Sequence, residues 1–435
     1  MQYATLGHSG IEVSRVCLGG MSFGEITEGH GHQWLIDQDG TREVIKRALD
    51  QGINFIDTAN CYAEGTSERY IGQALRDLGI ARDQVVLASK VFFNEGCLSR
   101  AAIEREIDGT LERLGTDYLD LYIIHRFDYS TPIEETMEAL DSLVRAGKVR
   151  ALGASEMYAY QLHNMQVVAE QHGWTKFTSM QCHYNLLYRE DERELIPVCR
   201  QFDMALTPYS PLASGHLARP TWDSDSTRSR TDTVMVNKYD GARDNDMVIV
   251  ARVAEVAERH GVPMAQVALA WHRARGVEAP IVGCSRPQRV DEAVAALDVE
   301  LSAEELDYME EPYVAHELVG PLARPGEKPL AGTTDPTCKN RTEDFLQFVL
   351  TDAVRDALVR YRSSAMSGRD VRKYACFRLY DAKISPERRE ARLTRQLCQV
   401  QVSHWGRLSF RRRGRMVAAC AKSRREPPSL RKRCT

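Results

Sequence analysis

The sequence lacks the features that mark membrane, secreted and metal-stabilised proteins. No run approaches the roughly 18 consecutive apolar residues that a membrane-spanning helix requires, and the N-terminus shows no basic segment followed by an apolar one, as a signal peptide would. The 11 cysteines are odd in number, scattered and without a C-x-x-C pair, which favours reduced thiols over disulfides or a zinc site. We therefore expect a cytosolic (cytoplasmic) protein with no membrane partner and no metal.

Charge of one sign is not in excess over the whole chain, but it is unevenly distributed. The 57 Lys and Arg against 61 Asp and Glu give a net charge of −4. Residues 335–435 hold 25 of the basic and 10 of the acidic residues, which leaves 32 against 51 before them. This shift predicts a domain boundary. We expect a folded domain over 1–322, a Pro- and Gly-rich linker over 323–342, and a basic, largely irregular tail with one helix over 343–435.

Short apolar segments alternate with longer amphipathic ones through the first 300 residues. Several of the short segments are apolar on consecutive residues, as is typical of parallel strands that are covered on both faces. Eight strands with helical crossovers predict an α/β fold, a (β/α)8 TIM barrel with a long loop between strands seven and eight. An open doubly wound sheet would need a G-x-G-x-x-G turn after the first strand, and residues 18–24 do not supply it. The predicted strands are 13–18, 54–58, 85–89, 119–124, 149–154, 178–182, 205–208 and 280–283.

Four ionisable side chains gather at the ends of three consecutive predicted strands. Asp57 ends the second strand, and Tyr62 lies in the loop that follows it. Lys90 ends the third strand and His125 the fourth. Because chemistry in such barrels takes place at the carboxyl ends of the strands, we expect these four side chains to form one site.

The four residue types suit the reduction of a carbonyl group. Hydride transfer leaves negative charge on the oxygen, which must be protonated as the charge forms. We expect Tyr62 to be the acid, Lys90 to lower the pKa of its phenol, and Asp57 to hold that ammonium in place. His125 would donate a hydrogen bond to the carbonyl oxygen.

Residues 52–62, 87–90 and 123–125 resemble the signature segments of the aldo-keto reductase superfamily, and the resemblance extends from residue 1 to about residue 322. Residues 124–135, 179–187 and 311–320 resemble in particular a bacterial subgroup that sometimes carries the label 1-deoxyxylulose-5-phosphate synthase. The resemblance implies a barrel, NADPH as cofactor, the roles given above, and a small carbonyl compound as substrate.

The resemblance also implies a set of cofactor contacts. Ser155 and Gln181 would bind the nicotinamide amide, and Tyr209 would stack on the nicotinamide ring. Small residues would let backbone N–H groups approach the pyrophosphate, and a helix start behind the last strand would hold the adenosine 2′-phosphate. The pyrophosphate residues are Ser210, Leu212, Ser214 and Gly215, and those of the last loop and helix are Gly283, Ser285, Arg286, Arg289 and Glu292.

Three positions depart from the family pattern. Glu156 and Ala293 stand where the family commonly has Asn, and Arg289 where it has Gln.

Two other functions fit the same sequence. A protein of this fold can serve as a redox-sensing regulatory subunit of a channel instead of an enzyme. We expect no nucleic-acid partner, except that the basic tail could act as a tether through phosphate contacts. The sequence indicates no oligomeric state.

Overall fold

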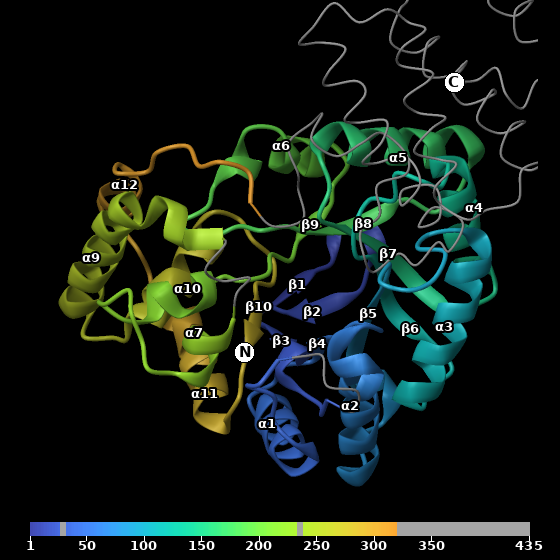
Figure 1. Cartoon of the computed structure of the whole chain (residues 1–435), viewed down its shortest axis with the longest axis horizontal. Coiled ribbons are helices and arrows are strands. Elements are labelled where there is room, and N and C mark those ends of the chain that lie inside the picture. Colours follow the sequence, from blue (N-terminus) through green and yellow to red (C-terminus); the bar gives the residue numbers. More distant parts are fainter. Residues whose placement is uncertain (27–31, 233–237, 320–435) are drawn as a thin grey trace, which may run out of the picture. The chain divides into compact units, whose positions relative to one another are not determined.

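A computed structural model describes residues 1–26, 32–232 and 238–319 of the chain. Eight parallel strands form one sheet in the order β10-β3-β4-β5-β6-β7-β8-β9. Its two edges meet, because the N–H groups of Ala279 and Ile281 donate to the carbonyls of Leu206 and Pro208 at 3.3 and 2.9 Å. The predicted (β/α)8 barrel is therefore confirmed (Figure 1). The strands are β3 Cys17–Gly19, β4 Phe55–Asp57, β5 Val86–Val91, β6 Leu119–Ile124, β7 Val149–Ser155, β8 Phe177–Gln181, β9 Ala205–Leu206 and β10 Ile281–Gly283.

Helices connect successive strands and lie around the barrel (Figure 1). Ser99 caps α3 by accepting a hydrogen bond from the N–H of Ala102, and Ser302 and Glu305 form a capping box on α12. The helices are α1 Gln38–Asp50, α2 Thr66–Asp77, α3 Arg100–Leu114, α4 Ile133–Arg145, α5 Ala159–His172, α6 Leu195–Gln201, α7 Thr227–Thr231, α9 Arg243–His260, α10 Met264–Ala274, α11 Pro287–Ala295 and α12 Ala303–Glu310.

The first predicted strand, over 13–18, is divided in the structure. Its early residues belong to β2 (Glu12–Ser14), which pairs antiparallel with β1 (Tyr3–Thr5) in a separate hairpin, and its end becomes β3 of the barrel. Three apolar side chains of the hairpin segment pack with inward-facing residues of the barrel strands, and they are Leu6, Ile11 and Val13. The hairpin therefore closes the interior of the barrel, a tertiary role that an apolar run in the sequence does not reveal.

The carboxyl ends of all eight strands face the same side, because the strands are parallel. The connection between β9 and β10 is the longest in the barrel, as predicted, and holds α7, α9 and α10 as well as a 3-10 helix at Ala213–Ala218. Long connections at this edge of a barrel usually carry function. We therefore expect the functional site at the carboxyl edge of the barrel strands.

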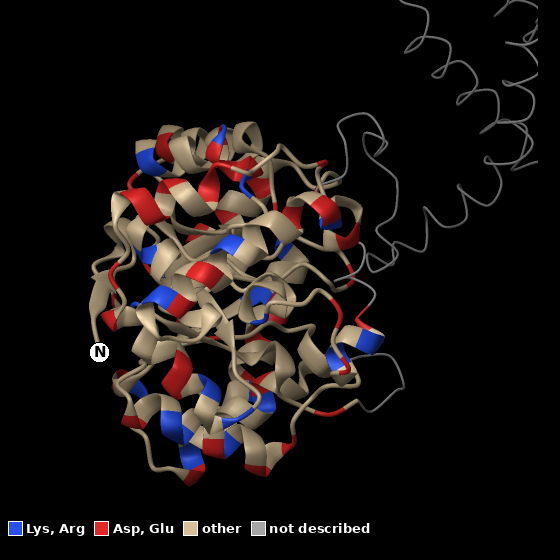
Figure 2. Ribbon diagram, turned by 90° about the vertical axis from the view of Figure 1, so that its left-hand side faces the viewer, with Lys and Arg blue, Asp and Glu red and all other residues tan. Residues whose placement is uncertain are grey.

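In Figure 2 the ribbon positions of acidic residues (red) and basic residues (blue) are intermingled on this face of the barrel. In the described ranges, no helix is both long and apolar enough to cross a bilayer. Within residues 1–26, 32–232 and 238–319, five cysteines carry free thiols, and they are Cys17, Cys61, Cys182, Cys199 and Cys284. The predicted linker over 323–342 and tail over 343–435 lie outside the described residues, so their boundaries and the tether stay predictions, as does a cytosolic location.

Candidate active site

The four predicted catalytic residues come together at the carboxyl edge of β4, β5 and β6. Asp57 is the last residue of β4, and Tyr62 opens the short 3-10 turn Tyr62–Gly65 that follows it. Lys90 lies within β5 and His125 directly follows β6. Parallel pairing of β4 with β5 and of β5 with β6 brings the three strand ends side by side.

The ammonium of Lys90 is fully buried, and each of its three hydrogens has an acceptor. Nζ donates to Asp57 Oδ1 at 2.5 Å, to the carbonyl oxygen of Thr58 at 2.8 Å and to Tyr62 Oη at 3.1 Å. An ammonium has donors and no acceptor, so the phenol oxygen must be the acceptor in the third bond. The hydrogen of Tyr62 itself is therefore not used in this bond.

The net direction of the pKa shift of Tyr62 is opposite to the sequence prediction. Burial raises the pKa of Tyr62 to about 12, although the positive charge of Lys90 acts to lower it. Burial disfavours the phenolate more than one ammonium favours it, because the anion would be withdrawn from water. Tyr62 therefore keeps its proton at neutral pH, which is the state that a general acid needs.

Lys90 remains charged in this site. Burial acts to lower the pKa of Lys90, but the negative charge of Asp57, the neighbouring Tyr62 and the hydrogen bonds to both together outweigh it and hold the pKa above its ordinary value. Asp57 is fixed in turn, because its second oxygen, Oδ2, accepts a hydrogen bond from Gln181 Nε2 at 3.0 Å. The carboxylate thus holds both the charge and the position of the ammonium.

His125 stands beside the phenol as a neutral imidazole. Its ring meets the ring of Tyr62 edge-on, with centroids 5.8 Å apart. Burial, together with the charges of Lys90 and Arg126, lowers the pKa of His125 well below its usual range. Its Nδ1 lies 3.8 Å from the sulfur of Cys61. If the thiol donates to Nδ1, the single ring hydrogen is on Nε2 and is available as a donor.

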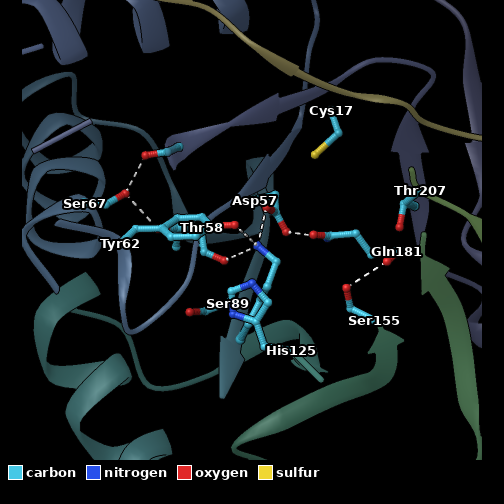
Figure 3. Close-up of polar contacts among 12 residues, drawn as sticks. Cys17, Asp57, Thr58, Tyr62, Ser67, Ser89, His125, Ser155, Gln181 and Thr207 are labelled. Atoms are coloured by element: carbon cyan, nitrogen blue, oxygen red, sulfur yellow. Dashed lines mark hydrogen bonds and ion pairs between the residues drawn. The ribbon is translucent and has the colours of Figure 1, made fainter. Parts of the chain in front are cut away.

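A chain of hydrogen bonds joins the predicted catalytic residues to two predicted cofactor residues (Figure 3). Ser155 Oγ donates to the carbonyl of Gln181 at 2.7 Å, and the Gln181 amide donates to Asp57. Both donations leave oxygen atoms as acceptors, Oγ of Ser155 and Oε1 of Gln181. Two acceptors suit the –NH2 group of a carboxamide, which has two hydrogens to donate.

Buried polar contacts fix the backbone beneath the phenol. Ser67 Oγ bonds Thr58 Oγ1 at 2.8 Å and also donates to the carbonyl of Gly20 at 2.8 Å. Glu68, fully buried, accepts hydrogen bonds from Ser89 Oγ and from Arg113 Nε, each at 2.5 Å. Since every partner in this network is satisfied, the loop between β4 and α2 has a defined conformation.

Tyr209, the predicted stacking residue, follows β9 and is held at its hydroxyl end. Lys238 Nζ donates to Tyr209 Oη at 2.8 Å and lies 4.3 Å from the ring centroid. Its backbone N–H donates to the carbonyl of Cys182 at 3.0 Å, which continues the pairing of β8 and β9. One ring face is covered by His183, whose centroid is 5.1 Å away at an interplanar angle of 14°.

The predicted pyrophosphate segment adopts a backbone that is uncommon for side-chain-bearing residues. Ser210 and Ser214 have φ values of 52° and 55°, and Gly215 has 103°, whereas Leu212 precedes the 3-10 helix at φ −100°. Successive left-handed residues turn backbone N–H groups toward one side of a loop, which suits an anion. All four residues are half-buried at the same edge as the catalytic residues.

The last predicted segment runs from the end of β10 into α11. Gly283 ends the strand with open space where a Cβ would stand, and Ser285 and Arg286 are exposed just before Pro287, the first residue of the helix. Arg289 pairs with Glu292 one turn further on, at 3.2 Å. Because Arg289 already forms this ion pair, Arg286 is better placed than Arg289 to bind a phosphate.

Glu156 directly follows β7 in the left-handed region, with φ at 48°. Asn adopts that conformation more readily than other side-chain-bearing residues, which accounts for its use by the family. Sequence reasoning also missed His183 and Lys238, which hold Tyr209. His183 lies two residues after Gln181 and so on the same face of the strand extension, a spacing that could have indicated it.

The comparisons with known proteins agree with this geometry. The sequence model of the Aldo/keto reductase family matches residues 15–313. An aldo-keto reductase of Fusarium vanettenii is 43% identical over 352 residues, covering 74% of this chain and 93% of the relative. Versiconal hemiacetal acetate reductase of Aspergillus parasiticus is 41% identical over 355 residues (75% and 100%). An aldo-keto reductase of Alternaria alternata is 41% identical over 342 residues (72% and 92%).

These relatives correct two of the sequence predictions. They are fungal, so the resemblance to a bacterial subgroup is not supported. They are named as reductases rather than as subunits of a channel, so the regulatory alternative is not supported either. The prediction of an oxidoreductase is confirmed by the family.

Proposed function

The chain belongs to the aldo/keto reductase family, and from this premise we propose that it reduces an aldehyde or ketone to an alcohol with NADPH. When bound, the reduced nicotinamide supplies the hydride. One observation supports the assignment of the acid: Lys90 uses the oxygen of Tyr62 as an acceptor, at 3.1 Å, and so leaves the phenolic hydrogen for the substrate.

Tyr62 protonates the carbonyl oxygen as negative charge develops there. The high pKa of Tyr62 keeps the proton on the phenol until that moment, and the phenolate that then forms is stabilised by the adjacent ammonium of Lys90. Asp57 keeps Lys90 charged and in place throughout. The ammonium thus acts on the product of the proton transfer more than on the resting phenol.

His125 orients the carbonyl as a neutral donor. Because the pKa of His125 lies well below its usual range, the ring is neutral, and a neutral imidazole N–H can donate a hydrogen bond without giving up its proton. Phe93 packs edge-on against His125 with ring centroids 4.9 Å apart, and the guanidinium of Arg126 lies over its ring at 4.5 Å. One relative is named for the reduction of a hemiacetal acetate, and we propose a small carbonyl compound as the substrate.

The residues present fit a nicotinamide dinucleotide phosphate. The acceptors of Ser155 and Gln181 would bind the carboxamide, and the half-buried ring of Tyr209 would meet the nicotinamide. Residues 210–215 would hold the pyrophosphate, and the start of α11 with Ser285 and Arg286 the 2′-phosphate. A second phosphate contact of this kind is what would favour NADPH over NADH.

The test is the substitution Tyr62→Phe, measured by NADPH oxidation with a panel of aldehydes. We expect kcat to fall by about 10²- to 10⁴-fold, the usual contribution of a positioned general acid, while NADPH affinity stays the same. Tyr3→Phe is the matched control, since Tyr3 lies on the β1–β2 hairpin and its hydroxyl donates to the carbonyl of Gly52, before the amino end of β4 and away from the candidate site. Near-wild-type turnover by the Tyr62 variant would refute the assignment.

A further inference from the structure

A column of stacked rings stands behind Tyr209. His183 stacks on Tyr209 with centroids 5.1 Å apart at 14°, and on its other side it stacks on Tyr188 at 4.3 Å and 16°. His183 and Tyr188 are only 4% and 2% exposed. The three rings are thus nearly parallel, and two of them are enclosed by the protein.

Backbone pairing sets the register of this column. His183 and Tyr209 are partners in a parallel bridge that extends β8 and β9, so their side chains lie side by side on one face. Asn185 and Tyr188 exchange two backbone hydrogen bonds of 3.1 and 3.0 Å in the turn that follows. The stacking therefore follows from the main chain and is not a chance approach of side chains.

The polar atoms of His183 fix the plane of its ring. Nε2 shares a hydrogen bond of 2.8 Å with Tyr239 Oη, and that oxygen also accepts from Asn185 Nδ2 at 3.2 Å. Nδ1 is buried and has no hydrogen-bond partner among the described residues. An unpartnered buried nitrogen is unfavourable for folding, so stability alone gives no reason for a histidine at this position.

The far end of the column is anchored by the segment after α12. His316 meets Tyr188 edge-on at 6.3 Å. Tyr313 Oη accepts from the N–H of Arg189 at 2.8 Å and donates to Glu190 Oε1 at 2.8 Å. Residues 313–316 therefore hold the turn that carries Tyr188 and close the column on the side away from Tyr209.

We propose that His183 is a positioning residue for the cofactor: backed by Tyr188, it holds the ring of Tyr209 in the orientation in which a nicotinamide can stack on the face opposite His183. Lys238 fixes the hydroxyl end of Tyr209, and His183 fixes the plane of the ring. The inference rests on the proposed function, because it requires that Tyr209 contact the nicotinamide. A flat neutral ring is the property that matters at position 183.

The test compares NADPH affinity, by fluorescence titration of the full chain, with kcat and melting temperature. His183→Leu removes the ring, and we expect NADPH to bind about 3- to 10-fold more weakly, the usual range for loss of one aromatic pair. His183→Phe keeps a flat ring and should restore affinity to within about twofold of wild type. A structural role alone would change the melting temperature without this difference between leucine and phenylalanine.

His172→Leu is the matched control, because His172 stacks on Trp174 at 4.3 Å and 13° on the outer end of α5. It should leave NADPH affinity unchanged. Should His183→Leu not fold, His183→Gln replaces it, since it keeps a polar group for Tyr239 but has no ring, and the same weakening is expected.

Tyr209→Leu separates the proposed contact of Tyr209 with the nicotinamide from the positioning role of His183. If it weakens NADPH binding and the ringless variants at position 183 do not, the positioning role is overturned and the proposed cofactor contact stands. If Tyr209→Leu itself leaves NADPH affinity unchanged, the cofactor contact is wrong and the positioning role falls with it.

Discussion

The two halves of the site are built in different ways. At β4 to β6 the functional side chains are inside the barrel wall, and Lys90 meets three acceptors while it is inaccessible to water. Behind β9 the candidate cofactor residues stand on a loop with left-handed backbone, and behind β10 Arg286 is exposed. In the function proposed above, the first half places a proton donor, whereas the second would bind a large anion.

The difference follows from what each task requires. A proton moves only between atoms at hydrogen-bonding distance, so its donor must be held rigidly. An extended dinucleotide has many contact points, and each of them contributes a modest share of the affinity. We therefore expect substitutions in the first half to affect turnover and folding together, and those in the second to affect mainly the affinity for NADPH.

The largest effect is expected for the buried pair. Lys90→Met leaves the carboxylate of Asp57 buried without its partner, and we expect the free energy of unfolding to fall by about 3–5 kcal/mol. Turnover should fall by about 10²-fold or more, because the phenolate of Tyr62 loses its adjacent cation. Denaturant unfolding and kcat measure the two losses separately.

The double variant Lys90→Met with Asp57→Asn sharpens this result. It removes both charges, so most of the stability should return while turnover stays low. Turnover that recovers together with stability would mean that the pair only supports the fold.

A smaller effect, confined to affinity, is expected behind β10. Arg286→Ala should raise the KM for NADPH by about tenfold, the value of a charge-assisted contact at an exposed site. Arg289→Ala should change it less, because that guanidinium already pairs with Glu292. The KM for NADH should not respond to either change, and a parallel rise for both cofactors would contradict the assignment of the 2′-phosphate.

The smallest effect is expected from His316, in the segment 313–316 that packs against Tyr188 at the far end of the stacked rings. Burial acts to lower the pKa of His316, but the hydrogen bond of 2.8 Å to Asp246 and the charge of that carboxylate, with smaller contributions from Val314 and Glu190, together hold the pKa above the ordinary value. The stability that the charged His316 gains from Asp246 is fully present below about pH 6.5, the pKa of an unfolded histidine. It is lost as pH rises through the pKa of His316 in the folded protein. The melting temperature should therefore decline over that range, and His316→Gln should flatten the decline without changing kcat. A profile that His316→Gln leaves unchanged would contradict this.

The comparison of the two halves also explains which residues could be predicted from the sequence and which could not. Asp57, Lys90 and His125 were predictable, because parallel strands bring their carboxyl ends to one edge whatever the surrounding loops do. The hairpin at 3–14 was not, since an apolar run does not reveal which surface it will cover. His183 was missed for a similar reason, because its partner in the column, Tyr209, is 26 positions away and reaches it only through the pairing of β8 with β9.

The pKa of Tyr62 was predicted in the wrong direction for a related reason. The neighbouring ammonium can be inferred from spacing, but the depth of burial depends on the whole barrel, and here burial is the larger influence. Only packing shows which of the two effects prevails.

Replacing Tyr62 with a fluorinated tyrosine, whose phenol is more acidic, tests the central claim most directly. Reduction requires the protonated phenol, so the high-pH fall in kcat should move to lower pH in step with the lowered phenol pKa. A fall that stays at the same pH as in the unmodified protein would contradict the claim that the proton comes from residue 62.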